Sequence, residues 1–274
     1  MASVDLTKRQ TGVVKEGVIG ALFLLCAVLS IVTTVGIVVV LLIDAADFFR
    51  DVSVWQFLSS TRWSPGIEPK EFGVLPLVSG TLTFTVLTSV IALPVGLLAA
   101  VYLSEYAPPR VRSALKPALE VLAGIPTVVY GYFALVYITP FLKATVLPEI
   151  RTFNVLSASI VVAIMIIPTV ASISEDAMRA VPDRLRYGGY GLGVTKFQVT
   201  TTVVIPAALS GIVSSFILAI SRAIGETMAV TIAAGNLPRM VNFLQPGEAF
   251  LRPVQTMTAA MVENQKGPEP VHEW

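Results

Sequence analysis

The chain has 274 residues, of which 54% are hydrophobic and only 14% are charged, against about 25% charged residues in ordinary soluble domains. Its formal net charge is +1, and the basic residues are spread over several segments, which argues against nucleic acid as a partner. A single cysteine and a single histidine, His272, exclude a Cys/His zinc cluster and any catalytic triad that needs a placed histidine. No tight acidic cluster indicates a metal site, and no cofactor is expected. The composition predicts an integral membrane protein.

Five apolar runs are long enough to cross a bilayer as helices, which takes roughly 20 residues each. The sequence therefore predicts an all-α, polytopic membrane helix bundle. The third run is interrupted by Gly124, Ile125 and Pro126, and Pro168 lies near the end of the fourth. The predicted spans are residues 17–43, 76–103, 117–142, 154–173 and 212–234.

Lysine and arginine predict the orientation, because they are in excess in cytoplasmic segments. Ten of them lie in the N-terminal tail and the connections on its side of the membrane, against five in the connections on the other side. The N-terminus is therefore expected in the cytoplasm. Residues 1–16 are predicted to form a cytoplasmic tail, residues 17–262 a transmembrane domain, and residues 263–274 a polar tail.

Arg222 and Glu226 lie inside the fifth apolar run, where a charged side chain costs about 2.5–3.5 kcal/mol on insertion scales. Positions four apart share one face of a continuous helix, so the Glu226 carboxylate is predicted to hold the Arg222 guanidinium. An arginine along a protein-lined path is a natural ligand for an anion. The alternative is a buried ion pair that fixes helix register. Thr227, Ser221 and Thr231 are candidate hydrogen-bond donors, with ordinary helix packing as the alternative.

The connection between the fourth and fifth runs has over thirty residues, much more than a helix–helix connection needs. Ser174 is predicted to cap a helix that begins there, and Pro182 to begin a second short helix. The glycines from Gly188 to Gly193 do not fit a dinucleotide-binding loop, and no P-loop occurs in the chain. ATP binding through a P-loop is therefore excluded.

Residues 187–206 resemble the coupling signature of bacterial ABC importer permeases, written E-A-A, three residues, G, nine residues, I-x-L-P. Gly193 matches the glycine, and Val203, Ile205 and Pro206 match the end at the right spacing. Tyr187, Gly188 and Gly189 stand where E-A-A is expected, so the acidic residue is lost. The resemblance implies that residues 174–206 form a cytoplasmic coupling loop for an ATPase.

Four further segments narrow the resemblance to the phosphate-specific ABC transporters and their C-type permease (PstC), over residues 18–261. They are FGVLPLVSGTLTFT from Phe72, GIPTVVYGYFAL from Gly124, SEDAMRAVP from Ser174 and SRAIGETMAVTIAAGN from Ser221. The resemblance implies a type I importer permease fold and a role for Arg222 and Glu226 in phosphate passage. It also implies a location in the bacterial inner membrane. The chain itself is then a transport subunit and no enzyme.

The implied partners are a second related permease, a pair of cytoplasmic ATPases, an extracytoplasmic phosphate-binding protein and membrane lipid. Trp55 and Trp63, in the connection after the first run, are candidates for docking the binding protein or for anchoring at the membrane interface. A permease for sulfate or molybdate is the nearest alternative function. An ion-coupled carrier or membrane enzyme is disfavoured, because no catalytic constellation appears.

Permeases of this family usually have six spans. After Gly235 the chain offers only a nine-residue apolar stretch, 254–262, which is too short to cross a bilayer. We interpret the chain as truncated or as a damaged reading frame; the alternative is a five-span chain that ends outside.

Overall fold

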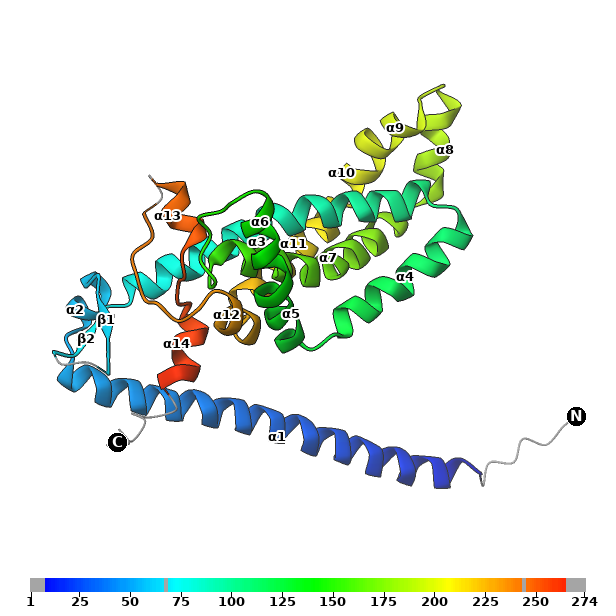
Figure 1. Cartoon of the computed structure of the whole chain (residues 1–274). Coiled ribbons are helices and arrows are strands. Elements are labelled where there is room, and N and C mark those ends of the chain that lie inside the picture. The colour runs from blue at the N-terminus through cyan, green and yellow to red at the C-terminus, as the bar shows by residue number, and fades with distance from the viewer. Residues whose placement is uncertain (1–7, 67–68, 243–244, 265–274) are drawn as a thin grey trace, which may run out of the picture. The chain divides into compact units, whose positions relative to one another are not determined.

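The computed structural model describes residues 8–66, 69–242 and 245–264 (Figure 1). The chain forms two compact units, Met1–Phe57 and Leu58–Trp274. In the described residues every regular element is a helix except one two-stranded hairpin, which the all-α prediction did not include. Four helices are long and apolar enough to span a membrane, or five if one bent pair counts as a single span.

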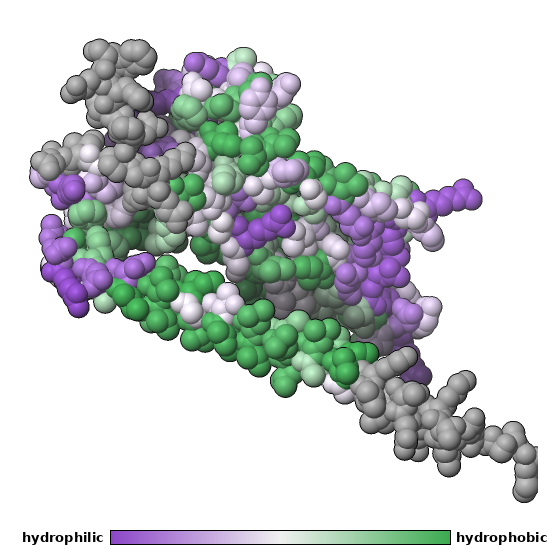
Figure 2. All heavy atoms as spheres, turned by 90° about the horizontal axis from the view of Figure 1, so that it is seen from below, coloured by the Kyte–Doolittle hydropathy of each residue, from purple (hydrophilic) through white to green (hydrophobic). Residues whose placement is uncertain are grey.

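The first unit consists mainly of one long helix, α1 (Lys8–Asp51), whose 44 residues span about 66 Å at 1.5 Å per residue. Its apolar side chains are exposed all along the segment 18–43, and Figure 2 shows them as a continuous hydrophobic surface. This confirms the first predicted span as a helix. The helix begins at Lys8, within the segment predicted as a tail, and residues 1–7 lie outside the described part.

A short connection follows α1. Phe48, Phe49 and Phe57 pack edge to face, with ring centroids 5.2–5.9 Å apart, where the chain turns into α2 (Val54–Ser59). Strands β1 (Trp63–Ser64) and β2 (Glu71–Phe72) then pair antiparallel, with Trp63 opposite Phe72. The Trp63 ring packs edge-on against Phe72 in this hairpin.

Two parallel helices, α3 (Leu75–Val101) and α7 (Val155–Arg179), form the centre of the second unit. The Ser159 hydroxyl donates to the Phe84 carbonyl, and further along both helices a Cβ on Gly96 would lie 2.6 Å from the Val170 Cβ. Only glycine at position 96 lets α3 and α7 come this close. The core is built around the buried apolar face of α7, and α3 continues into a π-helical segment, η1 (Tyr102–Tyr106).

The start of α7 follows the sequence prediction, but its end does not. Asn154 caps the helix, because its side-chain oxygen accepts a hydrogen bond from the Ser157 amide at 2.7 Å. The helix then continues without interruption to Arg179. The predicted new helix at Ser174 was therefore wrong: Ser174 is buried within α7, and its hydroxyl is hydrogen-bonded to that of Ser215 at 2.7 Å.

The third predicted span, 117–142, is two separate helical pieces. Its first part belongs to α4 (Pro109–Gly124), which buries none of its side chains. Ile125 and Pro126 are extended, and the chain restarts as a continuous helical stretch of spanning length, residues 127–145. That stretch comprises α5 (Thr127–Phe133), the π-helical η2 (Ala134–Ile138) and α6 (Thr139–Thr145).

The fifth predicted span, 212–234, is also broken. The chain leaves α7 through α8 (Asp183–Gly191) and rises through α9 (Lys196–Val199), the π-helical η3 (Thr200–Val204) and α10 (Ile205–Ala207). It bends by 70° into α11 (Leu209–Ile224), stops at 225–227, and restarts as α12 (Met228–Ala233). The spanning length therefore comes from the bent pair 196–207 and 209–224.

Two short helices follow, α13 (Pro246–Leu251) and α14 (Met257–Asn264). With eight residues, α14 is too short to cross a bilayer, as the sequence predicts for this stretch. Most of the predicted polar tail, residues 265–274, lies outside the described part of the chain.

Candidate functional site

The depth of Arg222 follows from how α11 packs on α7. The two helices run antiparallel: a Cβ on Gly211 would lie 2.4 Å from the Ala177 Cβ, and Ser215 bonds to Ser174. Arg222 lies two helical turns after Ser215 on α11, so the same antiparallel register places it level with the middle of α7. An arginine halfway along a membrane helix is costly unless it faces a protein-lined space.

Arg222 lies in the last turn of α11, within electrostatic range of Tyr130 of α5. Its positive charge acts on the Tyr130 hydroxyl, which donates a 2.7 Å hydrogen bond to the Leu122 carbonyl in the last turn of α4. Among the described residues, none forms an ion pair with the Arg222 guanidinium. The Arg222 side chain is half-buried.

Glu226 does not do what the sequence predicts. The predicted pair assumed a continuous helix, whereas α11 ends at Ile224 and Glu226 lies in the break. Its side chain is buried and accepts a hydrogen bond from the Ala229 amide at 3.1 Å, in the first turn of α12. A carboxylate there satisfies an amide that would otherwise lack a partner. Glu226 thus caps α12 and does not pair with Arg222.

The neighbouring hydroxyls are placed differently from one another. Thr227 lies in the break, and its hydroxyl donates to the Gly225 carbonyl at 3.3 Å. The Thr231 hydroxyl is used within α12, where it donates to the Thr227 carbonyl at 2.7 Å. Ser221 is exposed on α11. Of the three, Thr227 is the one that shares the helix break with Glu226.

Two helix breaks lead into short helices that pack on each other. The break at Gly225–Thr227 separates α11 from α12, and the break at Ile125–Pro126 separates α4 from α5. The two short helices touch, since a Cβ on Gly131 of α5 would lie 3.0 Å from the Ala229 Cα of α12. Broken helices with a charged residue at mid-depth are how transporters build substrate sites.

The other end of α7 carries the segment with the coupling signature. Tyr187, Gly188 and Gly189 lie on α8, which buries none of its side chains. Gly193 ends the turn after α8 with φ +75°, a conformation that suits glycine. The amides of Gly193 and Val194 close that turn on the carbonyls of Tyr190 and Gly189. This geometry is the physical reason for a glycine at the signature position.

The second half of the signature lies on the rising helix. Val203 and Ile205 are half-buried, while Pro206 is exposed just before the 70° bend. Gly189 packs on this helix, because a Cβ there would lie 2.9 Å from a Val199 methyl. The structure thus brings the two halves of the signature together. The exposed helix α8 carries the first half and packs on the helix that begins at α9 and carries the second half.

Sequence reasoning missed the ion pairs that hold this end together. The buried Glu175 carboxylate on α7 lies 2.9 Å from the Lys116 ammonium and 3.6 Å from the Arg112 guanidinium, both on α4. The Arg186 guanidinium of α8 lies 3.1 Å from the Glu105 carboxylate of η1. These partners are 59 to 81 residues apart, so no local pattern indicates them.

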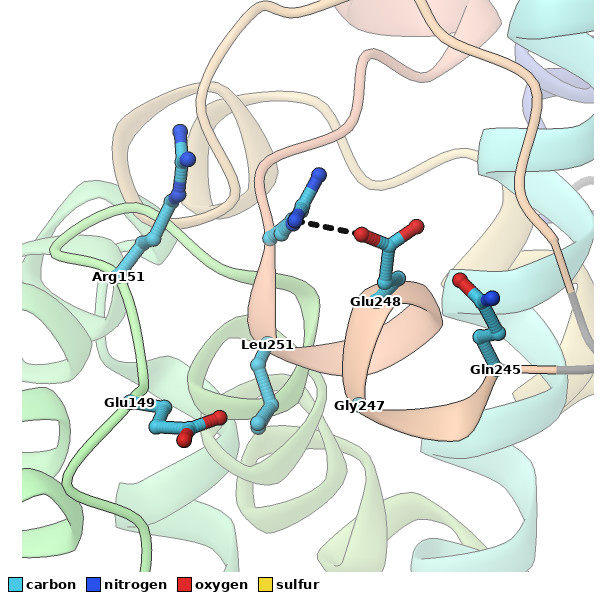
Figure 3. Close-up of a pocket in the computed structure, with 7 residues that line it drawn as sticks. Glu149, Arg151, Gln245, Gly247, Glu248 and Leu251 are labelled. Carbon is cyan, nitrogen blue, oxygen red and sulfur yellow. Dashed lines mark ion pairs between the residues drawn. The ribbon is translucent and has the colours of Figure 1, made fainter.

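A cavity of about 470 Å³ lies beside the start of α7 (Figure 3). The Glu248 carboxylate is paired with Arg252 at 2.5 Å across its wall, and the Arg151 amide donates to the Leu251 carbonyl. Burial, together with the charges of Arg252 and Arg151, lowers the pKa of the nearby Arg239. The cavity contains neither Arg222 nor Glu226 and is separate from the helix breaks. Its lining residues are Glu149, Arg151, Gln245, Gly247, Glu248, Leu251 and Arg252.

The fold and the two sites define a polytopic membrane protein with a charged site between broken helices and an exposed helix at one end. Residues 92–262, more than half of the chain, match the family described as "Binding-protein-dependent transport system inner membrane component". The chain belongs to this family. It is therefore a membrane permease component, and the type I importer fold predicted for it is confirmed.

Individual relatives agree with the family. The chain is 37% identical over 213 residues to the probable ABC transporter permease protein YqgH of Bacillus subtilis, covering 77% of this chain and 69% of that protein. It is 37% identical over 204 residues to the phosphate transport system permease protein PstC of Mesorhizobium japonicum, covering 68% and 62%. The chain thus spans about two thirds of the length of these relatives, and the resemblance to PstC is confirmed.

Among solved structures, the inward-facing MetNI methionine ABC transporter (CY5 native crystal form) is 21% identical, with a TM-score of 0.49 over 58% of this chain and 76% of that chain.

Proposed function

We propose that this chain is a permease subunit of an ATP-driven importer and forms part of the path for inorganic phosphate. The observation that carries the proposal is the Arg222 guanidinium, half-buried at mid-depth beside two helix breaks, with its charge uncompensated by any described carboxylate. A phosphate that leaves water needs a cation and hydrogen-bond donors in exchange. The names of its relatives support phosphate as the anion.

Glu226 and Thr227 complete this site. By capping α12, Glu226 fixes the start of that helix opposite Arg222 and keeps its own negative charge turned to the Ala229 amide. The Thr227 hydroxyl is in the same break and would become a donor to an anion at Arg222 by giving up its 3.3 Å hydrogen bond to the Gly225 carbonyl. Neutral hydroxyls and backbone amides would then share the remaining oxygens of the anion.

The partners follow from the family and the exposed α8. A pair of cytoplasmic ATPases would grip α8 and the turn at Gly193, and ATP hydrolysis belongs to those chains. A second permease would lie beside this one in the membrane, and a phosphate-binding protein would dock at the opposite end. The N-terminus is then cytoplasmic, on the same side as α8.

The test is ATP-dependent uptake of labelled phosphate into vesicles that contain this chain, a second permease, the ATPase and the binding protein. Arg222→Ala should abolish uptake while the complex still assembles, because the anion loses the cation that the described structure offers at mid-depth. Lys143→Ala, which removes an exposed cation of α6, is the matched control and should transport normally. Loss of assembly in Arg222→Ala would instead make the arginine a structural residue.

Sulfate and molybdate are the competing substrates, because the same guanidinium suits any tetrahedral oxyanion. Uptake of labelled phosphate in the presence of excess sulfate or molybdate distinguishes them. Undiminished uptake supports phosphate, and strong inhibition assigns the path to the competing anion.

A further inference from the structure

The segment η1 at the end of α3 is in contact with α4, α7, α8 and α9. It is a π-helical turn, closed by a hydrogen bond from the Ala107 amide to the Tyr102 carbonyl at 2.7 Å. Such wide turns occur often at functional positions. Carbonyls that the turn leaves exposed are taken up by Arg112 of α4, which donates to Leu103 and Ser104.

The link from η1 to α8 is a buried ion pair. The Arg186 and Glu105 side chains are only 12% and 5% exposed and lie 3.1 Å apart. The same guanidinium donates to the Met178 carbonyl at the end of α7 at 2.8 Å. Arg186 therefore ties α8 to two of the long helices at once.

A second link joins η1 to the helix that follows α8. The Lys196 ammonium lies 4.9 Å from the centre of the Tyr106 ring, within the range of a cation–π interaction. Lys196 begins α9, directly after the Gly193 turn. Both ends of the coupling region are thus attached to the same turn of α3.

These links matter because α8 has little else to hold it. Apart from Arg186 its side chains are exposed or only partly buried, and it is flanked by extended Pro182 and by Gly193 in a left-handed conformation, so the chain changes direction at both of its ends. Without the ion pair, a push on α8 would rotate it on these flanks and leave α3 in place.

We propose that Arg186 and Glu105 are positioning residues that transfer movement of α8 to α3. The inference rests on the proposed function of α8 as the ATPase contact. It adds the pair of residues through which movement of α8 is transferred to the long helices. Because α3 packs along α7 and against α11, which carries Arg222, displacement of η1 moves the walls of the candidate path. ATP-driven movement reaches the substrate site through this ion pair.

The experiment measures phosphate uptake and ATP hydrolysis in the same vesicles and compares their ratio. In Glu105→Gln and in Arg186→Gln, uptake per ATP should fall about tenfold while hydrolysis continues, since a broken buried pair no longer holds α8 against α3. The double variant should be no worse than either single variant, because both remove one interaction. Asp176→Asn, which removes an exposed partner of Lys116 at the same end, should keep the wild-type ratio.

Two results overturn the proposal. One is an unchanged ratio in both single variants. The other is a parallel fall of uptake, hydrolysis and assembled complex at constant ratio, which would make the pair purely structural. If neither single variant assembles, Tyr106→Leu decides, because it loosens the second link without exposing a buried charge. It should lower the ratio about twofold to threefold, and a wild-type ratio there rejects the proposal.

A distance measurement keeps this test independent of the transported anion. Spin labels at Leu98→Cys on α3 and Leu192→Cys after α8, in a Cys26→Ser background, both occupy exposed positions. Their separation should stay constant between nucleotide-free and ATP-bound complexes and should change in Glu105→Gln. A separation that changes equally in both proteins rejects the ion pair as the link. Failure of phosphate uptake in the wild type would reject the substrate and leave this result standing.

Discussion

Arg222 owes its chemistry to the place where its helix stops. In a continuous helix Glu226 would lie one turn further along the same face and neutralise it. Because α11 ends at Ile224, the carboxylate turns to the Ala229 amide and the guanidinium stays unpaired among the described residues. The separation of these two charges makes the site attractive to an anion.

For the single residue Arg222, the shape of the guanidinium should matter as much as its charge. Arg222→Lys keeps the positive charge but replaces a planar fork of donors by a point charge. We expect kcat/KM for phosphate uptake to fall at least about tenfold, because two-pronged contact with the anion is lost. Uptake kinetics in vesicles measure this effect, and wild-type kinetics in the lysine variant would show that charge alone suffices.

At the scale of single elements, the turn after α8 depends on one backbone conformation. Gly193→Ala places a Cβ at φ +75° and should cost about 1–2 kcal/mol. Gly188→Ala is the matched control, since Gly188 is helical with open space around it, and should be neutral or stabilising by up to about 1 kcal/mol. Thermal unfolding of both variants tests this, and equal stabilities would contradict the role of the turn.

The attachment of α4 depends on charge, because α4 buries none of its side chains. Hydrogen bonds to Glu175 and then Asp176 raise the pKa of Lys116 above its usual 10.5. A raised lysine pKa means that the stabilisation is complete below the ordinary pKa and is lost as pH rises through the higher folded value.

The stability difference between the wild type and Lys116→Met should therefore be constant up to about pH 10 and shrink above it. Thermal unfolding across this range measures the difference. Lys143→Met, which removes a lysine without an ion pair among the described residues, should show no such trend. A difference that persists at the highest pH would mean that packing holds α4.

At the scale of the whole molecule, the two ends of α7 should face opposite compartments. In a Cys26→Ser background, Tyr187→Cys on α8 should react with an impermeant maleimide only from the cytoplasmic side. Val146→Cys, after α6, should react only from the other side. Both positions are exposed. Labelling of sealed vesicles of each orientation tests the arrangement, and the reverse pattern would place the N-terminus outside.

The sequence predicts the membrane spans well, because their positions follow from hydrophobicity. It predicts the positions of the helix breaks poorly. Hydrophobic length located α1, α3 and α7, and the resemblance to the coupling signature located Gly193. The break after Ile224 was missed, because Ile212 to Ala234 is uncharged apart from Arg222 and Glu226 and its hydropathy does not show where a helical hydrogen bond is lost. Gly225 beside a carboxylate that can cap the next helix was the available signal. The Arg186–Glu105 pair joins distant segments, and one sequence gives no sign of it.

In the proposed path, the charge of Arg222, which has no ion-pair partner among the described residues, also affects what the protein must keep out. A fixed cation halfway along a membrane path repels other cations, as arginines do in water channels that reject protons. A subunit that stands open between turnovers would then leak neither protons nor potassium through this point. A cell that maintains an ion gradient across the same membrane could hold many idle copies of the permease without discharging it.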